Sequence, residues 1–242
     1  MAGTNYGVYG SWGYYAILIA ISVLSITLLI FNFLRPFFTV TFVVSTSLLF
    51  LLVVIPQLLY AEKRIEFVPR IASAGEITEG DRVLDIGTGR GFLAIEIAKL
   101  VKGCRVVGID IWGTTVKGEM HQGFVLGNTK KNAEKNAQLE SVSDRVEFRQ
   151  ADAREMPFES QSFDVVVSYL VMHQIIYGER GNRVLEETFR VLKPNGRLVI
   201  VDLIFGKKIM KKLQELGFRE IRVQSIRSLA SFSLLKMLSA VK

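Results

Sequence analysis

Three glycines stand between an apolar run and a helical pattern in the segment VLDIGTGRG, residues 83–91. Gly87, Gly89 and Gly91 carry no side chain, so a ligand can approach the backbone there and the chain can adopt positive φ. A dinucleotide-binding turn has its third glycine at the sixth position, where this chain has Phe92, and this spacing argues against NAD. Any tight turn from a strand into a helix can contain glycines, so the turn alone is a weak sign of a site.

Two acidic residues follow the next two apolar runs at comparable points. Asp110 ends the second run, 19 residues after Gly91, where a carboxylate can accept hydrogen bonds from both hydroxyls of a ribose. Asp152 follows the third run and is placed to accept a hydrogen bond from the exocyclic amine of adenine. Each acid alone is more often a solvated residue at a strand end. Together with the glycine turn, at the tips of three successive strands, they predict a nucleoside-binding site.

The elements that must position these residues follow a regular alternation. Short apolar runs predict seven strands, at Val83–Ile86, Val106–Ile109, Val146–Arg149, Val165–Ser168, Leu198–Val201, Ile221–Ser225 and Leu235–Val241. Helical spacing predicts helices between the first two strands and at Thr129–Glu140, Val184–Val191 and Lys207–Leu216, with Asn128 as the N-cap of the second helix. Strands that alternate with helices indicate an α/β fold, with an open, largely parallel, doubly wound sheet.

Four segments carry a resemblance to a known family. They are GDRVLDIGTGRG (80–91), GID (108–110), DRVEFRQADAREMPFESQSFDVVVS (144–168) and RVLKPNGRLVIVD (190–202). On these motifs residues 75–242 resemble the class I S-adenosylmethionine-dependent methyltransferases, above all the branch that methylates quinones, sterols or phospholipids. The resemblance implies a Rossmann-like, seven-stranded sheet, S-adenosylmethionine as the cofactor, and methyl transfer as the activity.

The resemblance also implies a role for each matching residue. Asp85 corresponds to the acid near the methionine amino group, and the three glycines form the cofactor turn. The remaining positions are the ribose acid Asp110, Ile111 beside adenine, the adenine-edge pair Asp152 and Ala153, and Ser168, which ends the strand facing the methyl group.

Methyl transfer from a sulfonium is an in-line displacement that needs alignment and desolvation but no covalent intermediate. A general base is optional and helps if the acceptor is a phenol or enol. His173, five residues after Ser168, is the candidate for this catalytic role, because imidazole is the side chain best suited to proton transfer near neutral pH. The alternative is a structural histidine at a helix start, and His121 is a weaker candidate.

Other candidate residues are less informative. Tyr169 and Tyr177 either line an acceptor pocket or belong to the core. With two histidines, one cysteine and no tight acidic cluster, we expect no metal.

Two regions depart from the family pattern. The segment Trp112–Gly127 is longer than the usual connection, and we interpret it as a lid or membrane-facing substrate loop, with a plain surface excursion as the alternative. Between Asp202 and the last strands there is only the short helix Lys207–Leu216, where relatives with large acceptors often insert a cap. One interpretation is that the bilayer itself completes the acceptor pocket.

The first 61 residues have a different composition from the rest. They contain no Asp or Glu and a single basic residue, Arg35. Residues 14–34 and 37–60 are uncharged runs of 21 and 24 residues, each long enough to cross a hydrocarbon core that needs about 20 residues. Because Arg35 and Pro36 suit an interfacial turn, residues 1–61 are predicted to form a transmembrane helical hairpin. The alternative is a buried apolar helix pair.

The residues after the second run orient this hairpin. Lys63, Arg64 and Arg70 follow it directly, and positive flanks stay on the cytoplasmic side. Residues 62–74 are predicted to be an amphipathic, basic connector near the lipid headgroups, followed by the methyltransferase domain at 75–242. The sequence therefore predicts an integral membrane protein whose catalytic domain lies on the cytoplasmic side.

The net charge of residues 62–242 limits the classes of binding partner to be expected. Residues 62–242 have 29 Lys and Arg against 23 Asp and Glu, a mild excess spread along helix faces, so nucleic acid is not expected. The leading hypothesis is a membrane-anchored methyltransferase with the lipid bilayer as partner and a lipophilic or small-molecule acceptor. The alternatives are a methyltransferase acting on a protein or soluble molecule, and a non-catalytic membrane adaptor that binds S-adenosylmethionine.

Overall fold

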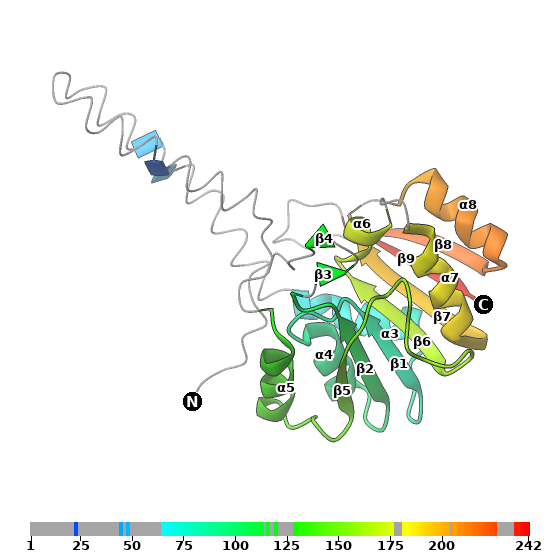
Figure 1. Ribbon diagram of the computed structural model, residues 1–242, viewed down its shortest axis with the longest axis horizontal. Helices are drawn as coiled ribbons and strands as arrows, with labels where there is room; N and C mark the ends of the chain where they lie inside the picture. Colours follow the sequence, from blue (N-terminus) through cyan, green and yellow to red (C-terminus); the bar gives the residue numbers. More distant parts are fainter. Residues whose placement is uncertain are drawn as a thin grey trace.

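A computed structural model describes residues 64–113, 115–116, 119–120, 128–176, 181–203, 205–226 and 235–242, with short pieces at 22–23, 44–45 and 47–48. Seven strands form one sheet in the order β5-β2-β1-β6-β7-β9-β8 (Figure 1). Their bounds are β1 Arg82–Ile86, β2 Arg105–Asp110, β5 Val146–Gln150, β6 Phe163–Tyr169, β7 Leu192–Asp202, β8 Arg219–Ile226 and β9 Leu235–Val241. All seven predicted strands are present, and the α/β, Rossmann-like fold is confirmed.

The sheet is mixed. The pairs β5–β2, β2–β1, β1–β6 and β6–β7 are parallel, whereas β9 runs antiparallel to both β7 and β8. A separate antiparallel pair, β3 (Thr115–Val116) and β4 (Glu119–Met120), lies within the long connection after β2. The four parallel pairs place the carboxyl ends of five strands at one edge of the sheet.

Helices cover both faces of this sheet. They are η2 Arg64–Phe67, α3 Val68–Ala74, α4 Phe92–Leu100, α5 Lys130–Leu139, α6 Met172–Ile175, α7 Gly181–Val191 and α8 Lys207–Leu216. One core cluster joins Val83 of β1 to apolar residues of α3, α4 and α5, and a second joins Leu84 of β1 to residues of α7 and α8. Successive residues of a strand point to opposite faces, so β1 is buried on both sides.

The segment before the sheet packs partly on the domain. Phe67, Val68 and Ile71 are almost fully buried and belong to the core cluster that α4 shares. Ile65 and Arg70 are exposed, and the position of residues 62–74 near lipid headgroups stays a prediction.

The predicted N-cap of α5 is off by one residue. Thr129 is the last extended residue, with φ −140° and ψ 149°, and its hydroxyl accepts a hydrogen bond from the Asn132 N–H at 3.2 Å. Asn128 lies one position too early to make this bond and has another role described below.

Most of the predicted membrane hairpin lies outside the described residues. Among the residues that the structure does describe, no helix is both long and apolar enough to cross a bilayer. The spans 14–34 and 37–60 therefore stay a prediction. His121, Tyr177 and most of the segment 112–127 also lie outside the described part of the chain.

Candidate active site

The glycine turn joins β1 to α4 at the carboxyl edge of the sheet. Gly87 and Gly91 have φ of +73° and +85°, a region that residues with a side chain rarely adopt. A Cβ on Gly87 would lie 2.4 Å from Val171, and one on Gly91 would lie 2.6 Å from Phe148. The Gly87 N–H donates to the Ile109 carbonyl at 2.8 Å, which holds the turn against the end of β2. Close packing and backbone conformation thus both require glycine here.

Asp110, at the end of β2, closes this turn. Its Oδ2 accepts from the Gly89 N–H at 2.8 Å, and its Oδ1 accepts from the N–H groups of Ile111 and Trp112 at 2.8 and 3.3 Å. Burial raises the pKa of Asp110, while these donors and the Asn128 side chain act in the opposite direction. The structure therefore brings the predicted ribose acid directly to the glycine turn.

Two residues beside Asp110 were not found by sequence reasoning as parts of the site. The Trp112 indole N–H donates to the Gly89 carbonyl at 2.8 Å and its ring lies edge-on to Phe148. Asn128 faces the Asp110 carboxylate, and its own Oδ1 is buried without a hydrogen-bond partner among the described residues. No spacing rule points to either residue, because both reach the turn from the long connection after β2.

Asp85 is the next-to-last residue of β1, paired with Gly108 on one side and Val167 on the other. Its side chain is 1% exposed, and Oδ2 has no hydrogen-bond partner within the part of the chain described. Burial raises the pKa of Asp85 to about 7, against the smaller lowering effects of the Thr88 side chain and the Ala94 backbone. A buried acceptor of this kind is suited to a ligand that brings its own positive charge.

Asp152 and Ala153 lie at the same edge of the sheet, in the loop after β5. The loop is tied to the end of β2, because the Ala151 N–H donates to the Asp110 carbonyl at 3.1 Å. Ala153 is buried. The Asp152 carboxylate, however, accepts from Arg154 through its backbone N–H at 2.9 Å and its Nε at 3.0 Å. The contact of Asp152 with adenine stays a prediction, and the structure adds Arg154 as the residue that orients it.

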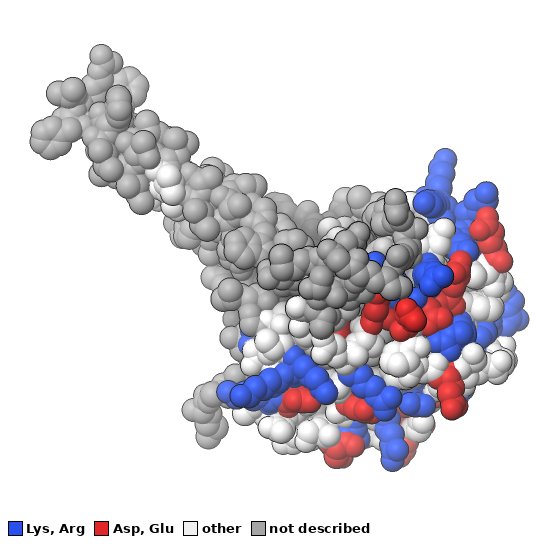
Figure 2. All heavy atoms as spheres, viewed as in Figure 1, with Lys and Arg blue, Asp and Glu red and all other residues white. Residues whose placement is uncertain are grey.

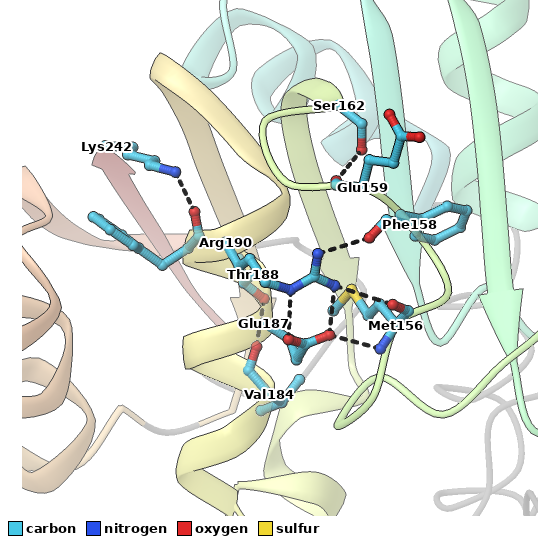
Figure 3. Close-up of polar contacts among 10 residues, drawn as sticks. Met156, Phe158, Glu159, Ser162, Val184, Glu187, Thr188, Arg190 and Lys242 are labelled. Atoms are coloured by element: carbon cyan, nitrogen blue, oxygen red, sulfur yellow. Dashed lines mark hydrogen bonds and ion pairs between the residues drawn. The ribbon is translucent and has the colours of Figure 1, made fainter.

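The same loop is anchored at its far end by α7 (Figure 3). Arg190 and Glu187 form a two-pronged ion pair, with 2.7 Å between Nε and Oε1 and 2.8 Å between Nη2 and Oε2. Arg190 also donates to the carbonyls of Phe158 and Met156, at 2.7 and 3.0 Å, and Glu187 accepts from the Met156 N–H at 2.7 Å. This network fixes the path of the chain that carries Asp152.

Two residues at the end of β6 have mainly structural contacts. Ser168 is 1% exposed, and its hydroxyl donates to the Ile86 carbonyl at 2.9 Å, which joins β6 to β1. Ser168 is the next-to-last residue of β6, and its hydroxyl is committed to the backbone, so its place facing the methyl group stays a prediction. Tyr169 is 3% exposed and packs on Phe92 with ring centroids 5.8 Å apart, so it belongs to the core.

His173 lies in α6, just beyond β6. Its Nδ1 is 2.7 Å from Oδ1 of Asp202, and its backbone N–H donates to Oδ2 of the same residue at 2.9 Å. The His173 side chain is 33% exposed, whereas that of Asp202 is 1% exposed. Sequence reasoning proposed His173 and missed Asp202 as its partner, although Asp202 directly follows the predicted strand Leu198–Val201 and ends the observed β7.

No group of three His, Cys, Asp or Glu side chains among the described residues is arranged to hold a metal ion. On the surface, Lys and Arg alternate with Asp and Glu across the face shown in Figure 2. Charge on that face is therefore distributed rather than gathered into one patch.

Comparisons with known proteins agree with this geometry. Residues 84–200 match the family model described as a methyltransferase domain. The erythromycin 3''-O-methyltransferase of Saccharopolyspora erythraea is 32% identical over 59% of this chain and 41% of its own length. The ubiquinone/menaquinone biosynthesis C-methyltransferase of Geotalea daltonii is 30% identical over 63% of this chain and 54% of its own. The chain thus spans about half the length of these curated relatives.

A solved structure supports the fold. The SAM-dependent methyltransferase from Aquifex aeolicus superposes with a TM-score of 0.58 at 20% identity, over 74% of this chain and 92% of that one. Residues 84–200 therefore match a methyltransferase domain, and the described fold is that of the methyltransferase from Aquifex aeolicus.

Proposed function

We propose that the chain is a membrane-anchored methyltransferase that moves a methyl group from S-adenosylmethionine to a lipophilic or small-molecule acceptor on the cytoplasmic side. The observation that carries the cofactor part is the buried acceptor Asp85 beside the glycine turn. S-adenosylmethionine carries an amino group and ribose hydroxyls, all of them donors. Asp85 Oδ2, Asn128 Oδ1 and the Asp110 carboxylate are acceptors that fit this set.

Each of these residues has a defined task in the proposal. When bound, S-adenosylmethionine supplies a methyl carbon activated by a positively charged sulfur. Asp85 holds the cationic amino group, and its burial strengthens that ion pair because few waters screen it. Asp110, already oriented by three backbone N–H groups, holds the ribose. The protein then contributes alignment and the exclusion of water.

The acceptor class and the membrane anchor rest on other observations. Two relatives are named for erythromycin and for ubiquinone/menaquinone biosynthesis, and these compounds are small or lipophilic molecules. The uncharged runs at 14–34 and 37–60 precede the domain in the sequence and are long enough to anchor it. Together they favour an acceptor that reaches the enzyme from the lipid phase.

The test is transfer of label from methyl-labelled S-adenosylmethionine by the full chain in detergent. The acceptor source is an extract of bacterial membranes that contains quinones and phospholipids. We expect label in the organic phase with the unchanged protein and with the control Asp144→Asn, an exposed acid distant from the turn in sequence. Asp85→Asn should abolish it. Label found only in protein or in water-soluble products would reject the lipophilic acceptor.

A second candidate is favoured by one observation. Because the apolar side of α3 is buried on the domain, the described part of the fold does not need lipid to cover it. An enzyme that uses a soluble acceptor, with the hairpin serving only to localise it, is therefore the alternative. Equal activity on water-soluble extract in the presence and absence of lipid vesicles would favour this alternative.

A further inference from the structure

Asp202 is a buried carboxylate that accepts two hydrogen bonds from a single neighbouring residue, His173. It ends β7, with its side chain 1% exposed. It accepts from the backbone N–H and Nδ1 of His173 and from the Leu203 N–H, the last at 2.7 Å. Because both the backbone and the ring of His173 bind the same carboxylate, the position and the rotation of the imidazole are fixed.

This arrangement selects one tautomer of the ring. A carboxylate is an acceptor, so Nδ1 must carry the proton that it receives, and in a neutral imidazole Nε2 is then the lone-pair nitrogen. The amide nitrogen of Gln174, a donor, lies 3.5 Å from Nε2, which agrees with an acceptor at that position. A third of the His173 side chain remains exposed, so Nε2 can meet a ligand.

The pair lies on the opposite side of the glycine turn from the nucleoside acids. Asp110 and Asp152 follow β2 and β5, whereas His173 and Asp202 follow β6 and β7, and β1 with its turn lies between the two groups. Val171, two residues before His173, packs directly against Gly87. The pair therefore lies beside the glycine turn, on the side away from Asp110 and Asp152.

We propose that His173 is the general base for an acceptor that carries an aromatic or enolic hydroxyl, and that Asp202 is the positioning residue that holds the Nδ1 proton, so that Nε2 is the accepting nitrogen of the neutral ring. This inference rests on the proposed function. The acceptor oxygen forms a bond to the methyl carbon while the carbon–sulfur bond breaks, and that bond's electron pair stays on sulfur. The hydroxyl proton moves to Nε2, and the imidazolium later loses it to water.

The first experiment observes the ring directly. The chain contains only two histidines. The full chain, labelled with ¹⁵N-histidine and bound to S-adenosylhomocysteine in detergent, therefore has two sets of imidazole nitrogen signals. The variant His121→Gln assigns each set to its residue. We expect His173 to carry its proton on Nδ1 and to lose this preference in Asp202→Asn. A proton on Nε2 in the unchanged protein, or the same spectrum in Asp202→Asn, overturns the positioning role.

The second experiment measures transfer to two matched probes, 4-octylphenol and 4-octylaniline. We expect the phenol to be labelled, with kcat/KM at least 100-fold lower in His173→Ala and partly restored by added imidazole, and about tenfold lower in Asp202→Asn. Preference for the aniline, no labelling of the phenol by a protein that binds S-adenosylhomocysteine, or full activity in His173→Ala overturns the inference.

A shared control separates this inference from the proposed function. Calorimetric affinity for S-adenosylhomocysteine should be the same, within about twofold, in the unchanged protein and in both variants, since neither residue is placed on the cofactor side. Absence of binding in the unchanged protein contradicts the proposed function itself. If only the His173 and Asp202 variants lose binding of S-adenosylhomocysteine, the pair has a structural role, and the proposal that His173 is a general base is overturned.

Discussion

At the scale of single residues, the site is marked by a carboxyl group that folding alone does not satisfy. Asp85 is buried in the central strand and leaves one oxygen without a partner in the described structure. Such groups reduce the stability of a fold and are found where a ligand compensates them. This reasoning makes the stability of the ligand-free protein a direct probe of the site.

The pH dependence of stability should show the effect of Asp85. Its pKa is about 7 in the folded protein and near 3.8 in the unfolded chain, so the folded state binds more protons between these values. Stability from this group is therefore lost as pH rises from about 4 to about 7. Between pH 5 and pH 8 the unchanged protein should lose on the order of 2 kcal/mol more than Asp85→Asn, which cannot ionise.

Thermal unfolding of both ligand-free proteins at the two pH values checks this, because the other titrating groups are common to both. Asp85→Asn should melt higher than the unchanged protein at pH 8 and close to it at pH 5. A variant that is less stable at pH 8 would show that the carboxylate is satisfied in the folded state.

Sequence reasoning found the residues of the site that lie within a contiguous pattern and missed those whose partners are distant in the chain. Asp85 and Asp110 lie in the last two residues of their strands and the three glycines follow β1, so strand order places them at one edge. Asp202 meets His173 across 29 residues, and Asn128 reaches Asp110 from the far end of a long connection. Neither pairing has a local signal, because each depends on how the ends of the elements meet.

At the scale of the elements, the turn between β1 and α4 tolerates no side chain at its first glycine. Gly87→Ala would add both the strain of φ +73° and a contact of 2.4 Å with Val171. We expect a loss of roughly 2–4 kcal/mol. The control is Gly80→Ala, where φ is +89° but no atom lies within 4 Å, and strain alone should cost about 1 kcal/mol.

Thermal unfolding of the two alanine variants separates the packing effect from the backbone effect. Equal destabilisation in both would mean that Val171 moves aside at little cost and that the turn is not closely packed. In that case the positioning of His173 beside the turn would also lose support.

The loop that carries Asp152 should depend on Arg190. Arg190→Met removes the ion pair with Glu187 and the bonds to two loop carbonyls, all partly buried. After allowance for solvent screening, the expected loss is about 1–3 kcal/mol, with weaker binding of S-adenosylhomocysteine because the loop loses its anchor. Arg222→Met, whose pair with Glu220 is long and exposed, should change stability by less than about 0.5 kcal/mol.

Calorimetry and thermal unfolding of these two variants are the checks. Unchanged cofactor affinity in a clearly destabilised Arg190→Met would show that the network supports the fold without positioning the loop. The stabilising effect of the pair also depends on pH, because the Arg190 hydrogen bond lowers the pKa of Glu187. The pair therefore stabilises the fold above the ordinary glutamate pKa, and this contribution is lost as pH falls below it.

Elements were predictable to the extent that burial leaves a pattern in the sequence. Six of the seven strands are apolar runs buried on one or both faces, whereas β8 is mostly exposed. All seven were found, although β7 begins six residues before its predicted start. The packing of α3 on α4 was not predictable, because the same apolar spacing suits a membrane surface and a protein core. The N-cap of α5 was missed because Asn128 and Thr129 are both good capping residues, and only the backbone conformation decides between them.

At the scale of the whole molecule, the described fold has a seven-stranded sheet with a core on each face, and the proposal adds a membrane anchor before it. If residues 14–34 and 37–60 span a bilayer, the full chain should stay in the membrane pellet after alkaline carbonate extraction and enter solution with detergent. Replacing Leu24 and Leu51 by Lys, near the middle of each run, should release it. Extraction of the unchanged chain by carbonate alone would contradict the anchor.

The central claim is that the turn after β1, with Asp85 and Asp110, binds S-adenosylmethionine. The most direct measurement is calorimetric titration of the full chain in detergent with S-adenosylhomocysteine, comparing the unchanged protein, Asp85→Asn and Asp144→Asn. We predict saturable one-to-one binding by the unchanged protein and Asp144→Asn, and binding about 10- to 100-fold weaker in Asp85→Asn, the loss of one charge-assisted hydrogen bond. Equal affinity in all three proteins, or no binding by the unchanged chain, would contradict the claim.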